Sequence, residues 1–389
     1  MFRFKNTANN QQDMTSTAII GAGPAGNYLG YLLAKNNIQT TIYEEHSEIG
    51  RPIQCTGILT PSITELMKLD NEFVVNKMNY AELFSENQHV RIRIQDIIVD
   101  RTKFDLHIAR MAEQAGAVIK TSHKFIGIKD GRLQFRKEDS FIETIQTKHD
   151  FLIGADGPNS TIAKLINPTA KIKYYIGKQV LVKNKFEKDT FQVYLGNNIA
   201  PKFFGWCVPE NESYSRIGVA ALEQPCKYFD ALLQRIKQKM NIEQKDIISY
   251  QGGLIPVYDP KFKVSMYDKI NNIQLAVIGD AALQIKATTG GGIIPGMRAA
   301  IPLTEHILKG KSYESGLKQL NKELKLHLLL RNTLNKFTDK DYDNLLELLK
   351  NPSLKEELHK TDRDSSTKLI IKLLIKEPRL LRYGLKVFF

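Results

Sequence analysis

The alternation of apolar and polar positions predicts a strand, a helix and a second strand at the start of the chain. Residues 17–20 are a short apolar run that leads directly into a glycine-rich turn. Residues 24–35 follow as a helix with a proline in its first turn, where no backbone N–H is needed. Residues 38–43 then alternate as a second strand. The polar lead-in, residues 1–16, has no such pattern, and we expect it to be disordered.

Further along the chain, the same patterns predict the remaining elements. Phe104, Ile108, Met111 and Ala115 fall near helical spacing and predict a helix over 102–116. The other predicted elements are strands at 151–153 and 274–278, β-like runs over 176–219, and helices from residue 301 to the end.

Segments typical of nucleotide binding occur at the start, near residue 154 and near residue 280, with a strand-rich block between the last two. This order predicts one nucleotide-binding sheet built from separated segments, with a second domain inserted into it. The predicted parts are a tail at 1–16, a nucleotide-binding domain at 17–173 and 270–310, a strand-rich substrate domain at 174–269, and a helical segment at 311–389.

The composition is that of an ordered protein with anionic partners. The 389 residues are 42% hydrophobic and 25% charged, which is ample for a buried core. The formal net charge of +13 favours nucleic acid, an acidic membrane surface or phosphate-bearing ligands. No stretch reaches the roughly 18 consecutive apolar residues of a membrane span. The N-terminus also lacks the apolar core of a signal peptide.

The three cysteines, Cys55, Cys207 and Cys226, are few and widely spaced. They form neither a disulfide framework nor a metal-ligand cluster, so we expect no metal site. A reducing, cytoplasmic location is the simplest that fits this usage. We expect Cys207 and Cys226 to be packing residues.

The glycine-rich turn fits the pattern G-x-G-x-x-G between a strand and a helix. Gly21 permits the tight turn, Gly23 lets the backbone approach a pyrophosphate, and Gly26 lets helix and strand pack closely. Glu44 closes the second strand, where a carboxylate can accept hydrogen bonds from ribose hydroxyls. The residues that complete the phosphate-binding turn are Pro24 and Ala25. The sequence therefore predicts a dinucleotide site, and a glycine-rich turn without a ligand is the alternative.

Three later segments resemble flavoproteins related to the aromatic hydroxylases. They are GADGPNS at 154–160, GDAA at 279–282 and DRTKFD at 100–105. The resemblance implies an α/β fold with a Rossmann-type FAD-binding domain of the aromatic-hydroxylase type, an inserted strand-rich substrate domain and a C-terminal helical segment. It implies that FAD is the cofactor, bound without a covalent link. The cofactor-binding residues that it implies are Arg101, Phe125, Asp156, Gly279 and Asp280.

The electron donor is left open. The sequence holds no second G-x-G-x-x-G, so a separate domain for a nicotinamide cofactor is not indicated. The reductant is therefore NAD(P)H at a shared site, or a protein such as ferredoxin.

Three more segments resemble the geranylgeranyl reductase family, and its archaeal branch most of all. They are RPIQCTG at 51–57, FFGWCVP at 203–209 and ATTGGGI at 287–293. The resemblance implies saturation of prenyl C=C bonds, most closely those of archaeal ether phospholipids. The implied cofactor-binding residues are Cys55, Thr56, Gly57, Gly291, Gly292 and Ile293. The implied substrate-binding residues are Phe204, Trp206 and Pro209, although ordinary sheet core is the alternative for the aromatic residues.

Cys55 is the implied catalytic residue, because a thiol is protonated at neutral pH and could give a proton to carbon after hydride transfer. The alternative is a small buried hydrophobe. Two positions depart from the family pattern: Thr56 where the family often has Gly, and Val208 where it often has Phe. Gly290 to Gly292 lack Cβ atoms, so we expect their N–H groups to approach the flavin ring.

The C-terminal stretch, residues 368–389, combines an apolar helical face with many cations, and Pro378 should interrupt it. A basic amphipathic helix suits an anionic membrane surface, and a helix packed on the protein with solvated lysines is the alternative. Nucleic-acid binding is not expected, since no recognisable module accompanies the charge. The sequence carries no signal for the oligomeric state.

Two rival functions remain open at this stage. A flavin-dependent monooxygenase or halogenase would consume oxygen. A non-catalytic, FAD-bound prenyl-lipid carrier would bind lipid without turnover. The expected function is hydride transfer from reduced flavin to an isolated prenyl double bond.

Overall fold

The computed structural model describes residues 15–137, 141–145, 149–360 and 366–380. A six-stranded sheet has the order β16-β17-β10-β1-β2-β6, and all its neighbouring strands are parallel except β16 and β17. Its strands are β1 (Ser16–Ile20), β2 (Gln39–Tyr43), β6 (Val118–Lys120), β10 (Phe151–Gly154), β16 (Ser265–Asp268) and β17 (Ile273–Val277).

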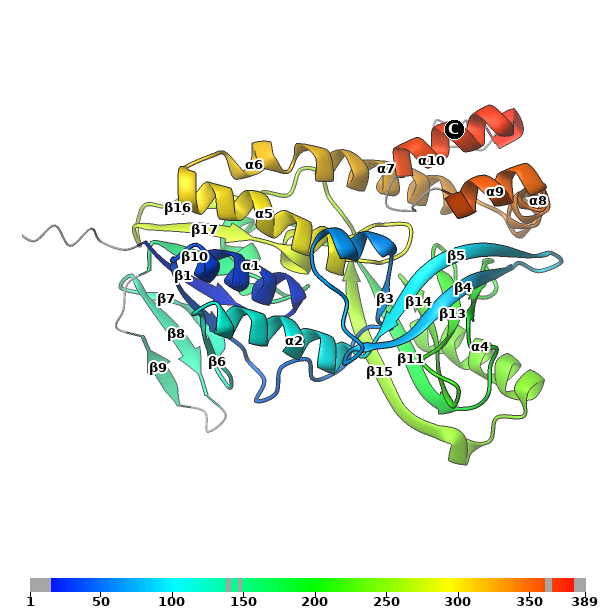
Figure 1. Cartoon of the computed structure of the whole chain (residues 1–389), viewed down its shortest axis with the longest axis horizontal. Coiled ribbons are helices and arrows are strands. Elements are labelled where there is room, and N and C mark those ends of the chain that lie inside the picture. The colour runs from blue at the N-terminus through cyan, green and yellow to red at the C-terminus, as the bar shows by residue number, and fades with distance from the viewer. Residues whose placement is uncertain (1–14, 138–140, 146–148, 361–365, 381–389) are drawn as a thin grey trace, which may run out of the picture.

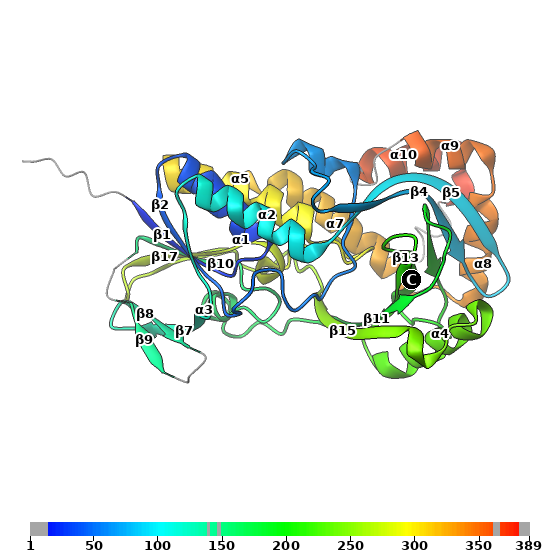
Figure 2. The ribbon, with the colours of Figure 1, turned by 60° about the horizontal axis from the view of Figure 1, so that its bottom comes forward.

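Both faces of this sheet are covered, which explains why β1 is buried along its whole length and is apolar from Ala18 to Ile20. Helices α1 (Pro24–Lys35), α2 (Arg101–Gln114) and α5 (Ile293–Lys309) lie over one face (Figure 2). Ile19 and Ile153 point into the core beneath them. The other face packs on α3 (Thr161–Ile166) and on a small sheet of β7 (Lys124–Lys129), β8 (Arg132–Arg136) and β9 (Ile142–Thr144).

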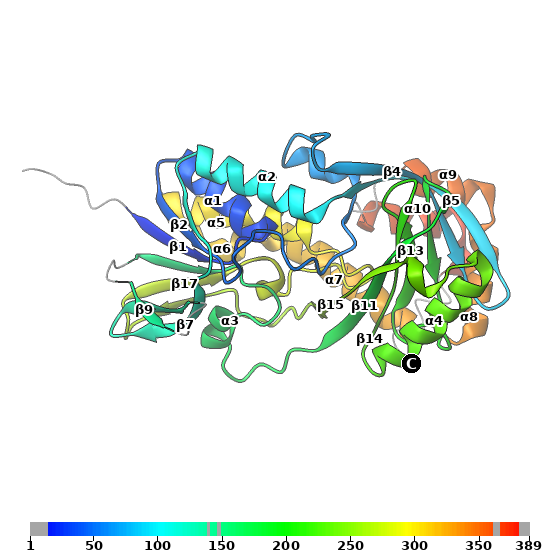
Figure 3. The same ribbon diagram turned by 90° about the horizontal axis from the view of Figure 1, so that it is seen from below.

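A second sheet of eight strands has the order β15-β11-β14-β13-β12-β4-β5-β3. Its strands are β3 (Ile58–Leu59), β4 (Val74–Phe84), β5 (His89–Val99), β11 (Tyr174–Lys183), β12 (Thr190–Tyr194), β13 (Phe204–Pro209), β14 (Tyr214–Ala221) and β15 (Ile247–Pro256). Helix α4 (Pro225–Met240) packs on β11 and β14 and covers one face (Figure 3).

The C-terminal helices begin beside α5, over the first sheet, and run to the second sheet, where the later ones contact β5 (Figure 1). They are α6 (Tyr313–Gly316), α7 (Lys318–Leu334), α8 (Asp339–Leu349), α9 (Pro352–Lys360) and α10 (Ser366–Lys376). Short 3₁₀ turns complete the described elements: η1 (Pro61–Glu65), η2 (Gln244–Asp246), η3 (Gly279–Ala282) and η4 (Pro378–Leu380). None of the helices in the described ranges is both long and apolar enough to cross a membrane.

Several predicted elements have different bounds in the structure. Ser16 belongs to β1 rather than to the lead-in, because its N–H donates to Asp150 Oδ2 at 2.8 Å. Residues 1–14, most of the predicted tail, lie outside the described residues. The last long run of helices begins at Ile293 rather than at 301.

Two strand pairings cross the predicted domain limits. Strands β4 and β5 lie within 17–173, but β4 pairs in parallel with β12 and so belongs to the second sheet. Strand β16 lies within 174–269, but it pairs with β17 in the first sheet. The pairing of β4 with β12 joins segments more than a hundred residues apart, which local patterns cannot reveal, whereas β16 and β17 are neighbours in the sequence.

The C-terminal amphipathic stretch is helical as far as Lys376, and Pro378 begins η4, so the predicted interruption is confirmed. Lys372 and Lys376 turn toward the buried Glu357, at 2.6 and 3.1 Å. Ile371 and Ile375 are exposed. Residues 381–389 of the stretch lie outside the described part of the chain.

Candidate active site

Three glycine-containing turns meet at one edge of the first sheet, because they follow three neighbouring parallel strands. Ile20 pairs with Gly154, and Gly154 pairs with Val277, so β1, β10 and β17 end side by side. The turns that follow these strands are GAGPAG, GADGPNS and GDAA. The carboxyl edge of a parallel sheet is where nucleotides bind in this kind of fold.

The three glycines of the first turn differ in what a side chain would meet, and Gly21 and Gly26 have the turn and packing roles that the motif predicts. Gly21 has a φ of +105°, and a Cβ there would lie 2.3 Å from Ala155 O. A Cβ at Gly26 would lie 2.1 Å from Gly21 O, so helix and strand could not pack as they do. A Cβ at Gly23 would meet nothing within 4 Å, which leaves open space in front of the helix. Pro24 and Ala25 form the first turn of α1 beside that space.

The N-terminus of α1 suits an anion. Gly23 provides no side-chain cap, and the first turn holds no acidic residue. The first N–H groups of a helix have no acceptor within the helix and carry partial positive charge. A pyrophosphate could therefore accept from them, which satisfies one requirement of FAD.

Glu44 stands at the end of β2 beside this turn, as predicted. Its Oε2 accepts from Ala22 N–H at 2.8 Å, and its Oε1 accepts from His46 N–H at 3.0 Å. The His46 ring also contacts Oε1 at 2.7 Å. These bonds fix the carboxylate where a ribose would lie over the glycine turn.

Asp156 and Asp280 lie on the second and third turns. Burial raises the pKa of both carboxyls, and raises that of Asp280 to about 6 despite the nearby Arg101, which lowers it. Asp156 Oδ2 accepts from Thr161 N–H at 2.8 Å. Oδ1 of Asp156 is buried with no partner among the described residues. An orphaned carboxylate oxygen at this edge fits a ligand that donates a hydrogen bond, such as a hydroxyl group.

Asp280 lies next to the N-terminus of α5. A Cβ at Gly292 would lie 2.5 Å from Asp280 Oδ1, so only glycine allows this approach. Gly279 has a φ of +65° and packs against Ala25. Gly296 packs against Gly279 in turn, which brings α5 close to the start of α1.

The loop at residues 50–57 wraps around the start of α2. Gly57 has a φ of +81°, and a Cβ there would lie 2.4 Å from Val99 O. Gly57 N–H points at Cys55 Sγ, 3.4 Å away. Arg101 forms two bonds to Asp105, with Nε to Oδ1 at 3.0 Å and Nη2 to Oδ2 at 2.8 Å.

Arg101 lies between Cys55 and the carboxyl edge of the first sheet, where the three glycine turns meet (the cofactor edge). Burial alone would lower the pKa of Arg101, but the Asp105 carboxylate and the Cys55 sulfur, within hydrogen-bonding range, raise it. Arg101 also lies near enough to Asp280 to act on the pKa of that carboxyl. The predicted residues Cys55, Arg101 and Asp280 therefore lie together.

The loop before α5 corrects one detail of the prediction. Gly290 N–H donates to Lys286 O at 2.8 Å, and Gly291 N–H points at Thr289 Oγ1 at 3.4 Å. Both amides are thus occupied within the loop and are not free donors for a flavin. Gly292 is the N-cap residue of α5 and Ile293 its first residue, so the free donors are those of the helix N-terminus.

Two residues on α7 hold the loop before α5, and neither was predicted from the sequence. Arg331 is buried and donates to Ala287 O at 3.1 Å and to Thr288 O at 2.7 Å. His327 Nδ1 and Thr288 Oγ1 are 2.6 Å apart. Arg331 also lies over the Phe203 ring, at 4.8 Å from its centroid. The signal in the sequence is that Arg331 falls on the same face of α7 as the buried Leu320 and Leu324.

Phe204 and Trp206 lie on the face of the second sheet opposite α4. Both pack with Phe203, which is fully buried. Trp206 also packs against Val208 in an apolar cluster with β4 and β5. This face is an apolar wall with partly exposed aromatic side chains.

Pro209 does not belong to this wall. Successive residues of a strand point to opposite faces. Gly205 approaches Leu232 of α4, and Cys207 is buried in the core beneath α4. Pro209 follows the same alternation, and its carbonyl accepts from Asn76 Nδ2 at 3.2 Å. Pro209 is therefore placed on the opposite side of the strand from Trp206, and its role in substrate binding stays a prediction.

Three other residues named in the sequence analysis are Phe125, Cys207 and Cys226. Phe125 is buried in the core and packs against Phe135 at 5.6 Å between ring centroids, and its part in cofactor binding stays a prediction. Cys207 is a packing residue as predicted, but Cys226 is exposed at the start of α4.

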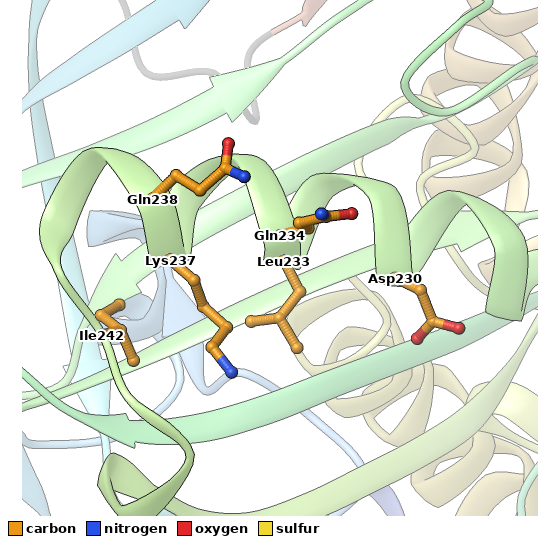
Figure 4. A pocket seen from close by; sticks show the side chains of 6 residues that line it. All are labelled: Asp230, Leu233, Gln234, Lys237, Gln238 and Ile242. Carbon is orange, nitrogen blue, oxygen red and sulfur yellow. The ribbon is translucent and has the colours of Figure 1, made fainter.

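An open pocket on the outer side of α4 is separate from these residues (Figure 4). It is lined by Asp230, Leu233, Gln234, Lys237, Gln238 and Ile242. None of the residues that line it belongs to the glycine turns or to the apolar wall. Within the described ranges, no group of three or more His, Cys, Asp or Glu side chains could hold a metal ion.

Comparison with solved structures defines the class. A geranylgeranyl bacteriochlorophyll reductase-like protein from Thermoplasma acidophilum matches with a TM-score of 0.77 and 20% identity, over 96% of this chain and 100% of that one. A flavin-dependent halogenase matches with a TM-score of 0.64 and 17% identity, over 90% of this chain and 72% of that one. At these identities the likeness concerns the fold, which is one that flavin-dependent enzymes use.

Sequence comparison defines the family. The model described as geranylgeranyl reductase catalytic domain matches residues 174–255, and that described as NAD(P)-binding Rossmann-like domain matches 19–55. A digeranylgeranylglycerophospholipid reductase of Methanocaldococcus jannaschii is 30% identical over 95% of this chain and 97% of that protein. Another, of Methanothrix thermoacetophila, is 24% identical over 91% and 95%. The chain belongs to the geranylgeranyl reductase family, which confirms the resemblance drawn from its motifs.

Proposed function

We propose that this chain is an FAD-dependent oxidoreductase that saturates C=C bonds in geranylgeranyl chains, most closely those of archaeal-type ether phospholipids. One observation carries the proposal. Cys55 lies beside Arg101 at the cofactor edge, and its loop also contacts the second sheet, where a Cβ at Gly253 would lie 3.0 Å from Gln54 O. A thiol thus lies where the glycine turns meet the apolar wall. The relatives named digeranylgeranylglycerophospholipid reductase support the same substrate class.

The residues at the sheet edge fit FAD. Gly23 and the start of α1 would hold the pyrophosphate, and Glu44 the ribose of the adenosine half. Asp280 would contact the ribityl and pyrophosphate part, and the start of α5, at Gly292 and Ile293, would face the flavin ring. When bound and reduced, FAD would supply a hydride to one carbon of the double bond.

Cys55 would supply the proton that completes the reduction. Its S–H bond breaks and a C–H bond forms at the neighbouring carbon, so the alkene gains one hydride and one proton. The thiolate left behind faces Gly57 N–H at 3.4 Å and the Arg101 guanidinium. Both groups stabilise negative charge on sulfur, and solvent then restores the proton.

The apolar wall would orient the prenyl chain and exclude water. Phe204, Trp206 and Val208 face the same side of β13, and the residues packed with Trp206 and Val208 are aliphatic or aromatic. An isolated alkene accepts hydride poorly, so close and dry positioning is required.

The donor and the location are part of the same proposal. The reductant is NAD(P)H or ferredoxin, acting on the flavin at the shared site. The protein is cytoplasmic and contacts an anionic membrane peripherally through α10, where Ile371 and Ile375 are exposed. Flotation with vesicles that contain anionic lipid, compared with neutral vesicles, tests the contact. An Ile371→Asp/Ile375→Asp variant should lose it.

The test of the activity is a product assay without oxygen. Purified protein with FAD and dithionite is incubated with a digeranylgeranyl glycerophospholipid, and mass spectrometry measures the product. We expect a gain of two mass units for each saturated bond, and a much smaller gain with Cys55→Ser. Absence of any gain while the flavin stays reduced would exclude this substrate. A hydroxylated or halogenated product formed only with oxygen would indicate a monooxygenase or halogenase instead.

A further inference from the structure

A chain of polar side chains crosses the apolar wall of the second sheet. Gln179 on β11 is its centre and is almost fully buried, with 4% of its surface exposed. Its Oε1 accepts from Thr56 Oγ1 at 3.0 Å and from Trp206 Nε1 at 3.3 Å. Its Nε2 donates to Gln251 Oε1 at 2.8 Å.

The network continues to the buried cation Arg216. This residue fixes which atoms of the two amides donate and which accept. Gln251 Oε1 also accepts from Arg216 Nη1 at 2.5 Å, and Arg216 pairs with Glu210 at 2.8 Å. Arg216 cannot accept a hydrogen bond, so Gln251 must present its oxygen to it. Gln179 must then present its amide nitrogen to Gln251 and its oxygen to Thr56 and Trp206.

The side chains of Gln179 and Trp206 can meet because the residue between them, on β14, is a glycine. Gln179 on β11 and Trp206 on β13 are both paired with Gly218 on β14. A Cβ at Gly218 would lie 2.4 Å from Trp206 Cζ2 and 2.7 Å from Gln179 Cβ. The indole therefore lies across the strand, over Gly218, to reach the amide.

One buried acceptor thus holds two parts of the site together. Thr56 directly follows Cys55 in the loop, and Trp206 is part of the apolar wall. Without the Gln179 oxygen, both donors would lose their partner, and a buried donor without a partner is costly.

We propose that Gln179 is a positioning residue that fixes the Cys55 loop against Trp206, and that the Thr56–Gln179–Trp206 contact selects which prenyl double bond the chain reduces. The selection rests on the proposed function, because it requires a prenyl chain between the wall and Cys55. The positioning itself does not require that function and can be measured without any substrate.

The sequence provides a probe for this test, because Trp206 is the chain's single tryptophan. Its fluorescence in the FAD-free protein reports the indole environment alone. In Gln179→Leu, which keeps the size but removes the acceptor, we expect a shifted emission maximum and stronger quenching by acrylamide. In Gln179→Glu, which keeps an acceptor for both donors, we expect a smaller change.

A second pair of variants leaves the buried amide in place. Thr56→Val removes the hydroxyl with little change in shape, and Thr56→Ser keeps it. We expect Thr56→Val to lower kcat/KM for the prenyl lipid about fivefold, as for the loss of one ordinary hydrogen bond, and to alter the ratio of partly saturated products. Thr56→Ser should keep the wild-type product ratio. Circular dichroism checks that each variant folds.

The outcomes separate this inference from the proposed function. Unchanged fluorescence in a folded Gln179→Leu protein would overturn the positioning role. Changed fluorescence with an unaltered product ratio in Thr56→Val would overturn the selection. A wild-type protein that reduces no prenyl lipid, but whose fluorescence responds to Gln179→Leu, would remove the proposed function and the selection, and leave the positioning role standing.

Discussion

The cofactor edge and the apolar wall are built on opposite principles. At the edge, the backbone of a glycine turn forms the centre of the site, and a few carboxylates such as Glu44 lie beside it. At the wall, side chains from separate strands form the site, and Gln179 joins Thr56 to Trp206 across β14. A backbone site can be recognised from one short stretch of sequence. A site of side chains that meet across strands depends on pairings that no single stretch reveals.

The largest expected effect contrasts two glycines of the same turn. Gly26→Ala places a Cβ 2.1 Å from Gly21 O and should destabilise the FAD-free protein by more than about 3 kcal/mol. Gly23→Ala meets no atom within 4 Å, so its stability should change by less than about 0.5 kcal/mol. The added methyl group should nevertheless weaken FAD binding at least about tenfold, because it enters the space of the pyrophosphate.

Urea unfolding and titration with FAD measure the two effects. Normal FAD affinity in Gly23→Ala would show that the pyrophosphate does not lie over this turn. Equal stability of the two variants would contradict the packing role of Gly26.

The second prediction concerns the cation that supports the loop before α5. Arg331→Met leaves the carbonyls of Ala287, Thr288 and Lys202 without their donor. It should cost about 3 kcal/mol of stability, as for the disruption of a buried hydrogen-bonded charge. The matched control is Lys325→Met on the same helix, where the side chain is exposed and the change should be within about 0.5 kcal/mol. Denaturant titration of both variants checks the difference, and equal values would contradict the role of Arg331.

The third prediction uses the raised pKa of Asp280. Burial raises this pKa from 3.8 to about 6, so between pH 4 and 6 the folded state holds a proton that the unfolded state has lost. The stability that Asp280 contributes therefore falls as pH rises through this window and stays lower above it. Allowing for partial exposure, the loss is about 2 kcal/mol.

Asp280→Asn should abolish this part of the pH dependence and stabilise the FAD-free protein at pH 7. Thermal unfolding at a series of pH values, with wild type and variant in parallel, measures the difference. Parallel pH profiles would mean that Asp280 titrates at its ordinary value.

The smallest expected effect tests which residues of β13 face the substrate. Phe204 faces the apolar wall, whereas Pro209 lies on the side of Gly205 and Cys207. Phe204→Ala should lower kcat/KM for the prenyl lipid about tenfold, which corresponds to about 1.4 kcal/mol of lost contact. Pro209→Ala should change it less than about twofold. A larger loss with Pro209→Ala than with Phe204→Ala would return the proline to the site.

The sequence predicted the local structure of the cofactor edge, because its signals are local. Helix α1 has the predicted bounds, and Glu44 lies beside the turn as expected. The alternation of Phe204, Trp206 and Val208 could also have placed Pro209 on the far side of the strand. This requires treating the motif as a strand with two faces rather than as a unit.

The wall and its supports could not be predicted in the same way. Strands β4 and β5 join the second sheet through a parallel pairing with β12, more than a hundred residues away. Gln179 and Arg331 are single polar residues in otherwise ordinary elements. Their importance comes from what tertiary packing places beside them, such as the empty position at Gly218.

The most direct test of the central claim follows the flavin in a single turnover without oxygen. Protein with bound FAD is reduced with one equivalent of dithionite and mixed with prenyl lipid in a stopped-flow spectrometer. The account predicts that the absorbance of oxidised flavin returns, with one bond saturated for each flavin reoxidised. Flavin that stays reduced with lipid, and reoxidises only when oxygen is admitted, would contradict it.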